Sequence, residues 1–374
     1  MSSQFLVVGA GLAGASAAWR LTERGCSVTL VERDVPASAQ GSSHGSARIF
    51  RYAYPERTYV DLVAASEPGW AELEARHGAP LITRCGALDF GARRDPHGLA
   101  AVLAAAGVEH ELVPREQARE RWPHVAVDTD VLHHAAGGVL DAETTVRTMV
   151  AAARAGGAEV LTGWPLQRLE RTGAGFTAHA ADGRTLSAGR VVVSAGGWLP
   201  DLLGDLPLPA GFLAAFPRLE VREENAFHFP YRDAGADWPA LIHENQDLSV
   251  YALPGGRDAG FRGQKVAEFN GGRVLPSAAA RTGVVDPANR ARVVEHVRRF
   301  LPGLEPEPYA ETTCLFTSTP TEDFVVDGAE GVTVLSPCSG HGAKFAPLLG
   351  EVAADVALGT GSVPERFRVG VARA

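Results

Sequence analysis

Three glycines and one acidic residue near the N-terminus have the types and the spacing of a dinucleotide-binding unit. Gly9, Gly11 and Gly14 follow the short apolar segment Gln4–Val8, and Glu32 closes the next apolar segment. The first glycine allows a tight turn, the second lets the backbone approach a pyrophosphate, and the third lets a helix pack closely on a strand. The phosphates then sit on free N–H groups at the helix N-terminus. Glu32 would bind a ribose diol and repel a 2′-phosphate, which argues against NADP. The unit predicts an adenine dinucleotide but does not separate FAD from NAD, and a glycine-rich turn in an ordinary α/β unit is the alternative.

Lysine is scarce in this chain. Of the 35 basic residues, 33 are arginine, and only Lys265 and Lys344 are lysine. Lysine differs from arginine in being a compact point charge whose pKa falls readily on burial. Because arginine is so strongly preferred in this chain, a remaining lysine is expected at a position whose function arginine cannot perform. The alternative is two surface lysines left by chance.

Buried strands spread from the beginning to the end of the chain are expected to position these residues. The expected strands are Gln4–Val8, Ser27–Val31, Ala158–Thr162, Arg190–Ser194 and Val332–Ser336. Besides the helix after the glycine turn, we expect helices at Thr58–His77, Thr144–Ala155, Arg290–Phe300 and Ala346–Leu358. A strand pair around Gly86 in Leu81–Phe90, a meander of Phe176–Ala181 and Arg184–Leu186, and short strands between 216 and 316 complete the pattern. The fold class is therefore α/β (α+β overall), with one sheet built from discontinuous segments and antiparallel material inserted between them.

Composition excludes several classes of protein. The 374 residues are 45% hydrophobic and 21% charged, with a net charge of −9, which disfavours disorder and a nucleic-acid partner. No run of 18 consecutive apolar residues occurs, so we expect no membrane span. Four cysteines without a CxxC pair favour a reducing, cytoplasmic setting and no metal site.

Four further segments occur in a fixed order with the N-terminal unit. They are Gly41–Arg51 (GSSHGSARIFR), Val191–Trp198 (VVVSAGGW), Thr313–Thr317 (TCLFT) and Ser339–Phe345 (SGHGAKF). Together they resemble the D-amino-acid-oxidase-type FAD-dependent oxidoreductases, and within them the monomeric sarcosine oxidase and N-methyltryptophan oxidase branch. The resemblance implies a Rossmann-like FAD-binding domain (1–83, 144–215 and 317–374) and a substrate domain with a mixed, largely antiparallel sheet (84–143 and 216–316).

The same resemblance implies the reaction. A secondary amine, often an N-methyl or cyclic amino acid, loses a hydride to flavin N5, the imine hydrolyses, and dioxygen is reduced to hydrogen peroxide. The partners would then be a small amine or amino acid and dioxygen, with a monomeric chain. Flavin-dependent amine dehydrogenation, or biosynthetic oxidation of a larger amine with another electron acceptor, is the alternative. A non-catalytic flavoprotein is a third reading.

Site residues follow by matching positions to the family's motifs. Lys265 matches a lysine that promotes oxygen reduction near flavin N5, and Arg48 matches a basic residue on the other face of the ring. Arg51 and Lys344 match a clamp for the substrate carboxylate, where an arginine fork and a lysine point charge act together. Cys314 matches a cysteine that carries FAD through an 8α-thioether, with an inert buried thiol as the alternative.

Two larger sets of residues complete the resemblance. The substrate-binding set is Arg51, Lys344, Tyr251, Phe316, Phe269 and Tyr54. The cofactor-binding set is Gly9, Gly11, Gly14, Glu32, Arg33, Ser42, His44, Arg48, Leu166, Ala195, Gly196, Trp198, Cys314, Gly340, Gly342 and Lys344. Sarcosine-type enzymes have a tyrosine where this chain has Phe316 and a histidine where it has Phe269. The two apolar rings argue against sarcosine and favour a bulkier, more apolar amino acid.

Overall fold

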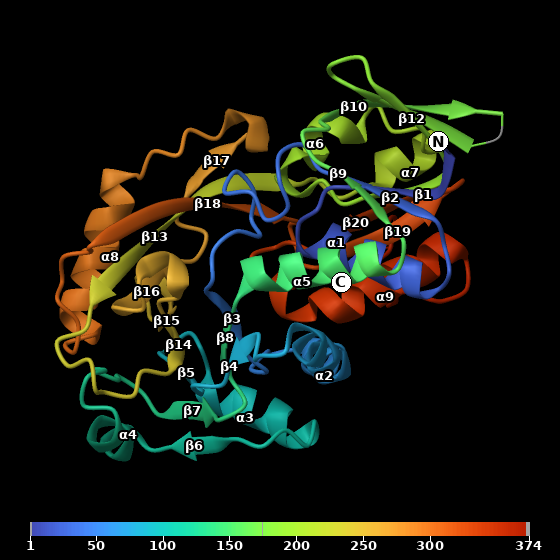
Figure 1. Ribbon diagram of the computed structural model, residues 1–374. Helices are drawn as coiled ribbons and strands as arrows, with labels where there is room; N and C mark the ends of the chain where they lie inside the picture. The colour runs from blue at the N-terminus through green and yellow to red at the C-terminus, as the bar shows by residue number, and fades with distance from the viewer. Residues whose placement is uncertain (1, 174, 372–374) are drawn as a thin grey trace.

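An eight-stranded sheet forms one half of the molecule in the computed structural model, which describes residues 2–173 and 175–371 (Figure 1). Its strands are β1 (Ser2–Val8), β2 (Val28–Val31), β9 (Glu159–Leu161), β10 (Leu166–Thr172), β11 (Gly175–Ala180), β12 (Thr185–Val193), β19 (Val325–Ala329) and β20 (Val332–Ser336). β12 pairs in parallel with β1 and with β20, while β2 lies in parallel between β1 and β9. Strands from the two ends and the middle of the chain thus share one sheet, which confirms the expected α/β class.

Three helices cover one face of this sheet, namely α1 (Leu12–Glu23), α5 (Ala142–Ala155) and α9 (Ala346–Leu358) (Figure 1). Alternation along β1 explains the two faces, because Phe5 and Val7 belong to the core shared with the helices. Leu6 and Val8 point the other way and pack with the antiparallel strands β10 and β11. The parallel part of this mixed sheet is apolar on both sides, as parallel strands buried between two layers require.

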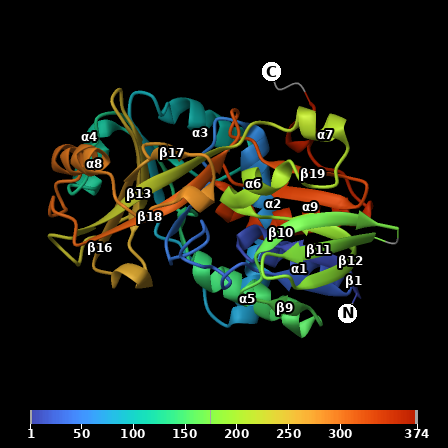
Figure 2. The ribbon, with the colours of Figure 1, turned by 90° about the horizontal axis from the view of Figure 1, so that it is seen from above.

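A nine-stranded sheet forms the other half. Its strands are β5 (Ala87–Phe90), β6 (Glu111–Val113), β7 (Val131–His134), β13 (Glu220–Pro230), β14 (Ala240–Glu244), β15 (Ser249–Pro254), β16 (Gly263–Glu268), β17 (Arg273–Leu275) and β18 (Ala310–Ser318). Only the β5–β14 pair is parallel among these described strands, so the sheet is mixed and largely antiparallel, as expected. Helix α8 (Pro287–Phe300) lies on its outer face (Figure 2), against Phe227 and Phe229 of β13.

The remaining elements are short. A third sheet joins β3 (Arg48–Phe50), β4 (Ile82–Thr83) and β8 (Gly138–Leu140). The other helices are α2 (Arg57–His77), α3 (Pro96–Ala105), α4 (Arg115–Arg121), α6 (Leu199–Leu203) and α7 (Ala210–Ala215). Single 3-10 turns are η1 (Gly196–Trp198), η2 (Arg257–Ala259), η3 (Ala278–Ala280), η4 (Gly342–Phe345) and η5 (Glu365–Phe367). No helix within residues 2–173 and 175–371 is both long and apolar enough to cross a membrane.

Two local expectations were wrong. Leu81–Phe90 does not form a strand pair, because β4 pairs with β8 whereas β5 pairs with β7 and β14 in another sheet. Gly86, with φ of +77°, turns the chain from one sheet to the other. The segments Arg184–Leu186 and Arg190–Ser194 are not separate strands, since β12 runs unbroken over Thr185–Val193. Its first half pairs with β11 and its second half lies between β1 and β20.

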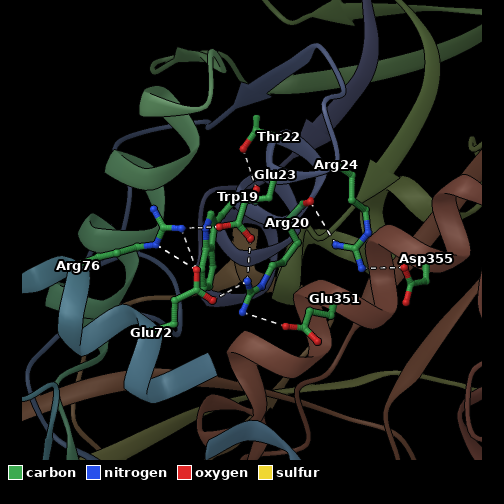
Figure 3. Close-up of polar contacts among 9 residues, drawn as sticks. All are labelled: Trp19, Arg20, Thr22, Glu23, Arg24, Glu72, Arg76, Glu351 and Asp355. Atoms are coloured by element: carbon green, nitrogen blue, oxygen red, sulfur yellow. Dashed lines mark hydrogen bonds and ion pairs between the residues drawn. The ribbon is translucent and has the colours of Figure 1, made fainter. Parts of the chain in front are cut away.

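A buried arginine ties the three helices α1, α2 and α9 together (Figure 3). The guanidinium of Arg20 contacts Glu23 at 2.7 Å, Glu72 at 2.8 Å and Glu351 at 2.9 Å. It also lies 3.6 Å from the ring centroid of Trp19. Glu72 and Glu351 belong to α2 and α9, so the cation joins elements that are distant in sequence.

Replacing Arg20 with alanine is expected to lower the free energy of unfolding by about 2 kcal/mol, because its partner carboxylates lose their counter-charge while staying partly exposed. Chemical denaturation measures the change. The matched control is Arg147→Ala, where an exposed i,i+4 pair with Glu143 is removed, and this change should stay within about 0.5 kcal/mol. Equal effects of the two substitutions would contradict the role given to Arg20.

Candidate active site

One cavity lies between the two large sheets and is lined by both of them. Its walls come from the glycine turn after β1, the segment 41–51, the turn after β12, the strands β15, β16 and β18, and η4. The helix α1 starts at one end of this cavity and η4 with α9 starts at another. Neither α1 nor α9 has an acidic residue in its first turn, so no carboxylate of the helix itself compensates the positive end of either helix dipole.

The glycine turn is packed too tightly for side chains. Gly9 has φ of +96°, and a Cβ there would lie 2.5 Å from the carbonyl oxygen of Ser194. A Cβ on Gly11 would lie 2.9 Å from Ser43 Oγ at the cavity wall. A Cβ on Gly14 would lie 1.8 Å from the carbonyl oxygen of Gly9, so this glycine lets α1 pack on the turn. The tight turn at Gly9 and the close packing at Gly14 agree with the spacing, whereas the approach of a pyrophosphate to Gly11 stays a prediction.

Glu32 directly follows β2 and lies beside the glycine turn at the cavity wall. Its carboxylate accepts hydrogen bonds from the backbone N–H of Ala10 at 2.7 Å and of Asp34 at 3.1 Å, which fixes its orientation. Burial nevertheless raises the pKa of Glu32. The guanidinium of Arg33 stacks 4.4 Å from the ring centroid of Trp198, so an aromatic and a cation line the wall beside the carboxylate.

Arg48 and Lys265 form one pair of cations in the cavity. Arg48 lies on β3 and donates to the backbone carbonyls of Ala47, Ser42 and His44. Lys265 lies on β16, is 6% exposed, and donates to the carbonyl of Ala47 at 3.4 Å. Burial, with Arg48 nearby, lowers the pKa of Lys265 to about 8. All these acceptors are neutral carbonyls, and the carboxylate of Asp258 acts on Lys265 without forming an ion pair with it.

Arg51 and Lys344 form a second pair around Tyr54. Lys344, on η4, is 1% exposed and donates to Tyr54 Oη at 2.9 Å and to the carbonyl of His341 at 2.7 Å. The Arg51 guanidinium stacks 4.2 Å from the Tyr54 ring centroid and donates to the carbonyl of Ala53. Burial and the charge of Arg51 hold the pKa of Lys344 well below its usual value. Among the residues the structure describes, no carboxylate lies within 4.0 Å of any of the four cations.

Aromatic side chains close the cavity near Cys314. Phe269 and Phe316 have ring centroids 5.7 Å apart, and a Cβ on Gly340 would lie 2.8 Å from each ring. Tyr251 and Cys314 line the same wall. Burial raises the pKa of the Cys314 thiol, while Lys265 and Arg48 act in the opposite direction. Cys338 also lines the cavity.

Most of the residues singled out in the sequence lie in this one cavity. Those lining it are Gly9, Gly11, Glu32, Arg33, Ser42, Arg48, Arg51, Tyr54, Leu166, Ala195, Gly196, Trp198, Tyr251, Lys265, Phe269, Cys314, Phe316, Gly340, Gly342 and Lys344. Gly14 and His44 are not among the residues that line the cavity. Gly14 packs α1, and His44 offers its carbonyl to Arg48 while burial and nearby cations lower the pKa of its ring to about 3. Their roles toward a bound cofactor stay predictions.

Three charged residues of the cavity were not anticipated, namely Arg94, Glu244 and Glu322. Arg94 bonds Asp89 at 2.7 Å and Glu244 at 3.1 Å, and it also donates to the carbonyl of Ala53. One arginine among 33 carries no signal of its own in the sequence. Glu322 follows the TCLFT motif by five residues and has φ of +59°, which no local pattern indicates. No cluster of three or more metal-binding side chains occurs in the described part of the chain.

The fold and site define an oxidoreductase with a dinucleotide cofactor, and comparisons with known proteins agree. The chain belongs to the DAO family of FAD-dependent oxidoreductases, whose pattern it matches over residues 4–356. It is 32% identical over 365 residues to N-methyl-L-tryptophan oxidase of Yersinia pestis (strain Pestoides F), covering 95% of this chain and 94% of that one.

Solved structures confirm the fold. NikD, an amino acid oxidase essential for nikkomycin biosynthesis, superposes in its open form with a TM-score of 0.87 at 24% identity, covering 98% of this chain and 97% of NikD. L-proline dehydrogenase from P. horikoshii gives a TM-score of 0.80 at 18% identity, covering 95% of this chain and 92% of the other.

The residues present fit FAD. A diphosphate needs backbone N–H donors at close range, which the glycine turn and the start of α1 can offer, where the Ser43 hydroxyl now accepts from the N–H of Leu12. A ribose diol needs an oriented acceptor, and a carboxylate that accepts two backbone bonds still has lone pairs free, as Glu32 does. An electron-accepting ring is stabilised by nearby positive charge, which Arg48 and Lys265 supply.

Gly14→Ala is expected to lower the flavin content of the purified protein about tenfold or more, because α1 would be pushed away from the glycine turn. Flavin absorbance per chain measures this. The control is Gly211→Ala in α7, where a Cβ meets nothing within 4 Å, and this variant should keep its flavin. Unchanged flavin content in Gly14→Ala would show that the close packing is not needed.

Proposed function

We propose that this protein is an FAD-dependent oxidase of a secondary amino acid, N-methylated or cyclic, with dioxygen as the electron acceptor. The observation that carries the proposal is the set of four cavity cations, in two pairs, with no carboxylate partner among the described residues. Bound FAD supplies the two-electron oxidation of the carbon next to the substrate nitrogen. The two pairs of cations then have different tasks.

Arg51 and Lys344 bind the substrate carboxylate in this proposal. The guanidinium can give two parallel hydrogen bonds and the ammonium adds a point charge. Tyr54 holds both groups, since it accepts from Lys344 and stacks under Arg51. The clamp fixes the amine and its neighbouring carbon relative to the ring. The same positive field lowers the pKa of a bound ammonium, so the substrate reacts as the free amine.

Lys265 and Arg48 stabilise negative charge. Charge develops on dioxygen as it accepts electrons, and a cation already in place in the cavity lowers the energy of that state. Lys265 is suited to this task because it is buried and is oriented only by the neutral carbonyl of Ala47. Its lysine side chain points a single ammonium into the cavity, where a guanidinium would need more room.

Phe269 and Phe316 support an apolar substrate. Their rings pack against each other beside Gly340, so these two side chains offer no hydrogen bond to a small polar substrate. A larger apolar or ring-bearing amino acid fits better. The relationship to N-methyl-L-tryptophan oxidase, an enzyme named for an N-methylated aromatic amino acid, supports the same class.

The proposal includes a covalent bond between FAD and Cys314. The thiol is buried, lines the cavity and lies in the field of Lys265 and Arg48, which favour the thiolate. The proposal further includes dioxygen as the electron acceptor, a monomeric chain and a reducing cytoplasmic setting. The four free cysteines support the reducing setting.

The division into an FAD-binding domain (1–83, 144–215 and 317–374) and a substrate domain (84–143 and 216–316) is likewise a proposal. It is supported by the sheets, because the strands of the eight-stranded sheet fall in the first set of ranges. The nine-stranded sheet falls in the second set, except for the last two residues of β18.

Aerobic turnover tests the proposed function. We expect one hydrogen peroxide per substrate oxidised, and Lys265→Met should slow reoxidation of the flavin about a hundredfold. Because the pKa of Lys265 is about 8, its ammonium is present below that pH, so reoxidation should fall as the pH rises past 8 and be independent of pH in Lys265→Met. Stopped-flow absorbance and peroxide assays measure these rates. Turnover in air without peroxide would overturn the proposal.

Lys344→Met is expected to lower kcat/KM about a hundredfold for an amino acid, because the buried carboxylate loses a charged donor. The control is the same amine without its carboxylate, for which the variant and the parent should agree within about threefold. Steady-state kinetics with the two substrates measure the difference. Equal losses with both substrates would mean that Lys344 supports the fold or the cofactor and not the clamp.

A further inference from the structure

The carboxyl group of Glu224 is buried on the cavity side of the nine-stranded sheet, and the proposed oxidation of the substrate does not use it. Glu224 lies in the middle of β13 and is 0% exposed. Along β13, Phe227 and Phe229 face α8, so Glu224, Ala226 and His228 face the opposite side, where Lys265 of β16 pairs with His228. Glu224 therefore points toward the cavity side, behind the residues that line the wall.

The hydrogen bonds of Glu224 are incomplete. One carboxyl oxygen, Oε2, accepts from the backbone N–H of Gly272 at 3.0 Å. The other, Oε1, is fully buried and has no partner. Glu268 of β16 adds negative charge, whereas Arg222 on the same strand adds positive charge. Burial is the largest effect and raises the pKa of Glu224 to about 7. An unpartnered buried carboxyl destabilises the fold, and such groups are concentrated at functional sites.

Cys314 is the direct cross-strand neighbour of Glu224. The two residues are paired in the antiparallel register of β13 and β18, so their side chains are on the same face, with Cβ atoms about 5 Å apart. The charge of Glu224 acts on the Cys314 thiol and on the Tyr251 hydroxyl. Cys314 lines the cavity while Glu224 does not, so the carboxyl lies behind the thiol.

We propose that Glu224 is the base that takes the proton of the Cys314 thiol when FAD becomes covalently attached. This inference rests on the covalent bond included in the proposed function. A thiol is a poor nucleophile and its thiolate a good one, so a base beside it accelerates attack. The partnerless oxygen of Glu224 is the position where a transferred proton can be held.

The attachment reaction balances with dioxygen as the oxidant. A bond forms between Cys314 Sγ and the 8-methyl carbon of the flavin, and the S–H bond and one C–H bond of that methyl group break. Two electrons and two protons pass in total to dioxygen, giving one hydrogen peroxide. Glu224 accepts the thiol proton and releases it, so it is unchanged at the end.

Other charged groups around the thiol stabilise the thiolate once it forms. Lys265 of β16, Arg48 of β3 and Arg281 after η3 all lower the pKa of Cys314. At neutral pH the two arginines stay protonated, and Lys265, with a pKa of about 8, is mostly an ammonium, so these groups act mainly as counter-charges. Among the described groups that act on Cys314, Glu224 is the carboxylate. Glu224 can therefore serve as the base, while the three cations serve as counter-charges to the thiolate.

Glu224→Gln tests this assignment because it keeps the shape and the acceptor for Gly272. The chain is produced in a riboflavin-limited host, FAD is added, and flavin that stays with the protein after acid precipitation is followed over time. We expect attachment at pH 7 to slow about tenfold or more while noncovalent FAD binding is retained. The attachment rate of the parent should rise with pH through about 7, where Glu224 becomes a carboxylate, and that step should be missing in Glu224→Gln.

Two controls keep the outcome clear. Glu220→Gln removes a carboxylate from the same face of β13, at its exposed end, and should leave attachment unchanged. Cys314→Ser should bind FAD without attaching it. If the parent chain binds FAD but never holds it after acid, the covalent bond is absent and both ideas fail. If the parent attaches FAD and Glu224→Gln does so at the same rate and with the same pH profile, only the role of Glu224 is overturned.

If the Glu224→Gln variant cannot be isolated without flavin, the purified holoenzyme is tested instead. The measured quantity is the fraction of its flavin that stays with the protein after acid precipitation. A fraction equal to that of the parent overturns the proposal, and a mostly acid-labile flavin supports it.

Discussion

Positive charge that has no ion-paired carboxylate, gathered in one cavity, is the constraint on which the rest of this structure depends. Arg48, Lys265, Arg51 and Lys344 are oriented by backbone carbonyls and a tyrosine hydroxyl, with no carboxylate in ion-pair contact among the described residues. Removing such charges from water without a counter-ion is costly. The arrangement is stable only if the fold is rigid enough to hold the cations there, and it is useful only if anionic ligands supply the missing charge.

In each pair, one cation comes from the short segment 48–51. The other cation comes from a large sheet or from the turn that follows it. Arg48 and Arg51 come from the segment that includes β3, Lys265 comes from β16, and Lys344 comes from η4. The scaffold must therefore hold three distant parts of the chain in register. The parallel strands fix the turn before α9, the antiparallel strands fix Lys265, and the Arg20 cluster in Figure 3 holds α9 against α1 and α2.

Helices and strands with a strong apolar periodicity could be predicted from the sequence. Cavity residues that lie within motifs could also be singled out from the sequence. The expected helix Ala346–Leu358 coincides with α9, and Thr58–His77 differs from α2 by one residue. The two lysines stood out because arginine replaces lysine elsewhere. Long-range pairing was not predictable, so β4 and β5 were joined wrongly although they belong to different sheets. Arg94, Glu244 and Glu224 lie outside the motifs, and their placement in the fold follows from tertiary contacts alone.

The contrast between Arg94 and Arg51 explains why only some of the buried charges define the site. Both donate to the carbonyl of Ala53, so they lie side by side. Arg94 is neutralised by Asp89 and Glu244, and burial with these two carboxylates makes it a fixed part of the wall. Arg51 has no such partner and stacks on Tyr54 instead. A neutralised arginine thus holds the carbonyl that orients an unneutralised one. Because the sequence has arginine at both positions, only the placement of two carboxylates distinguishes the ion-paired Arg94 from Arg51, to which we propose ligand binding.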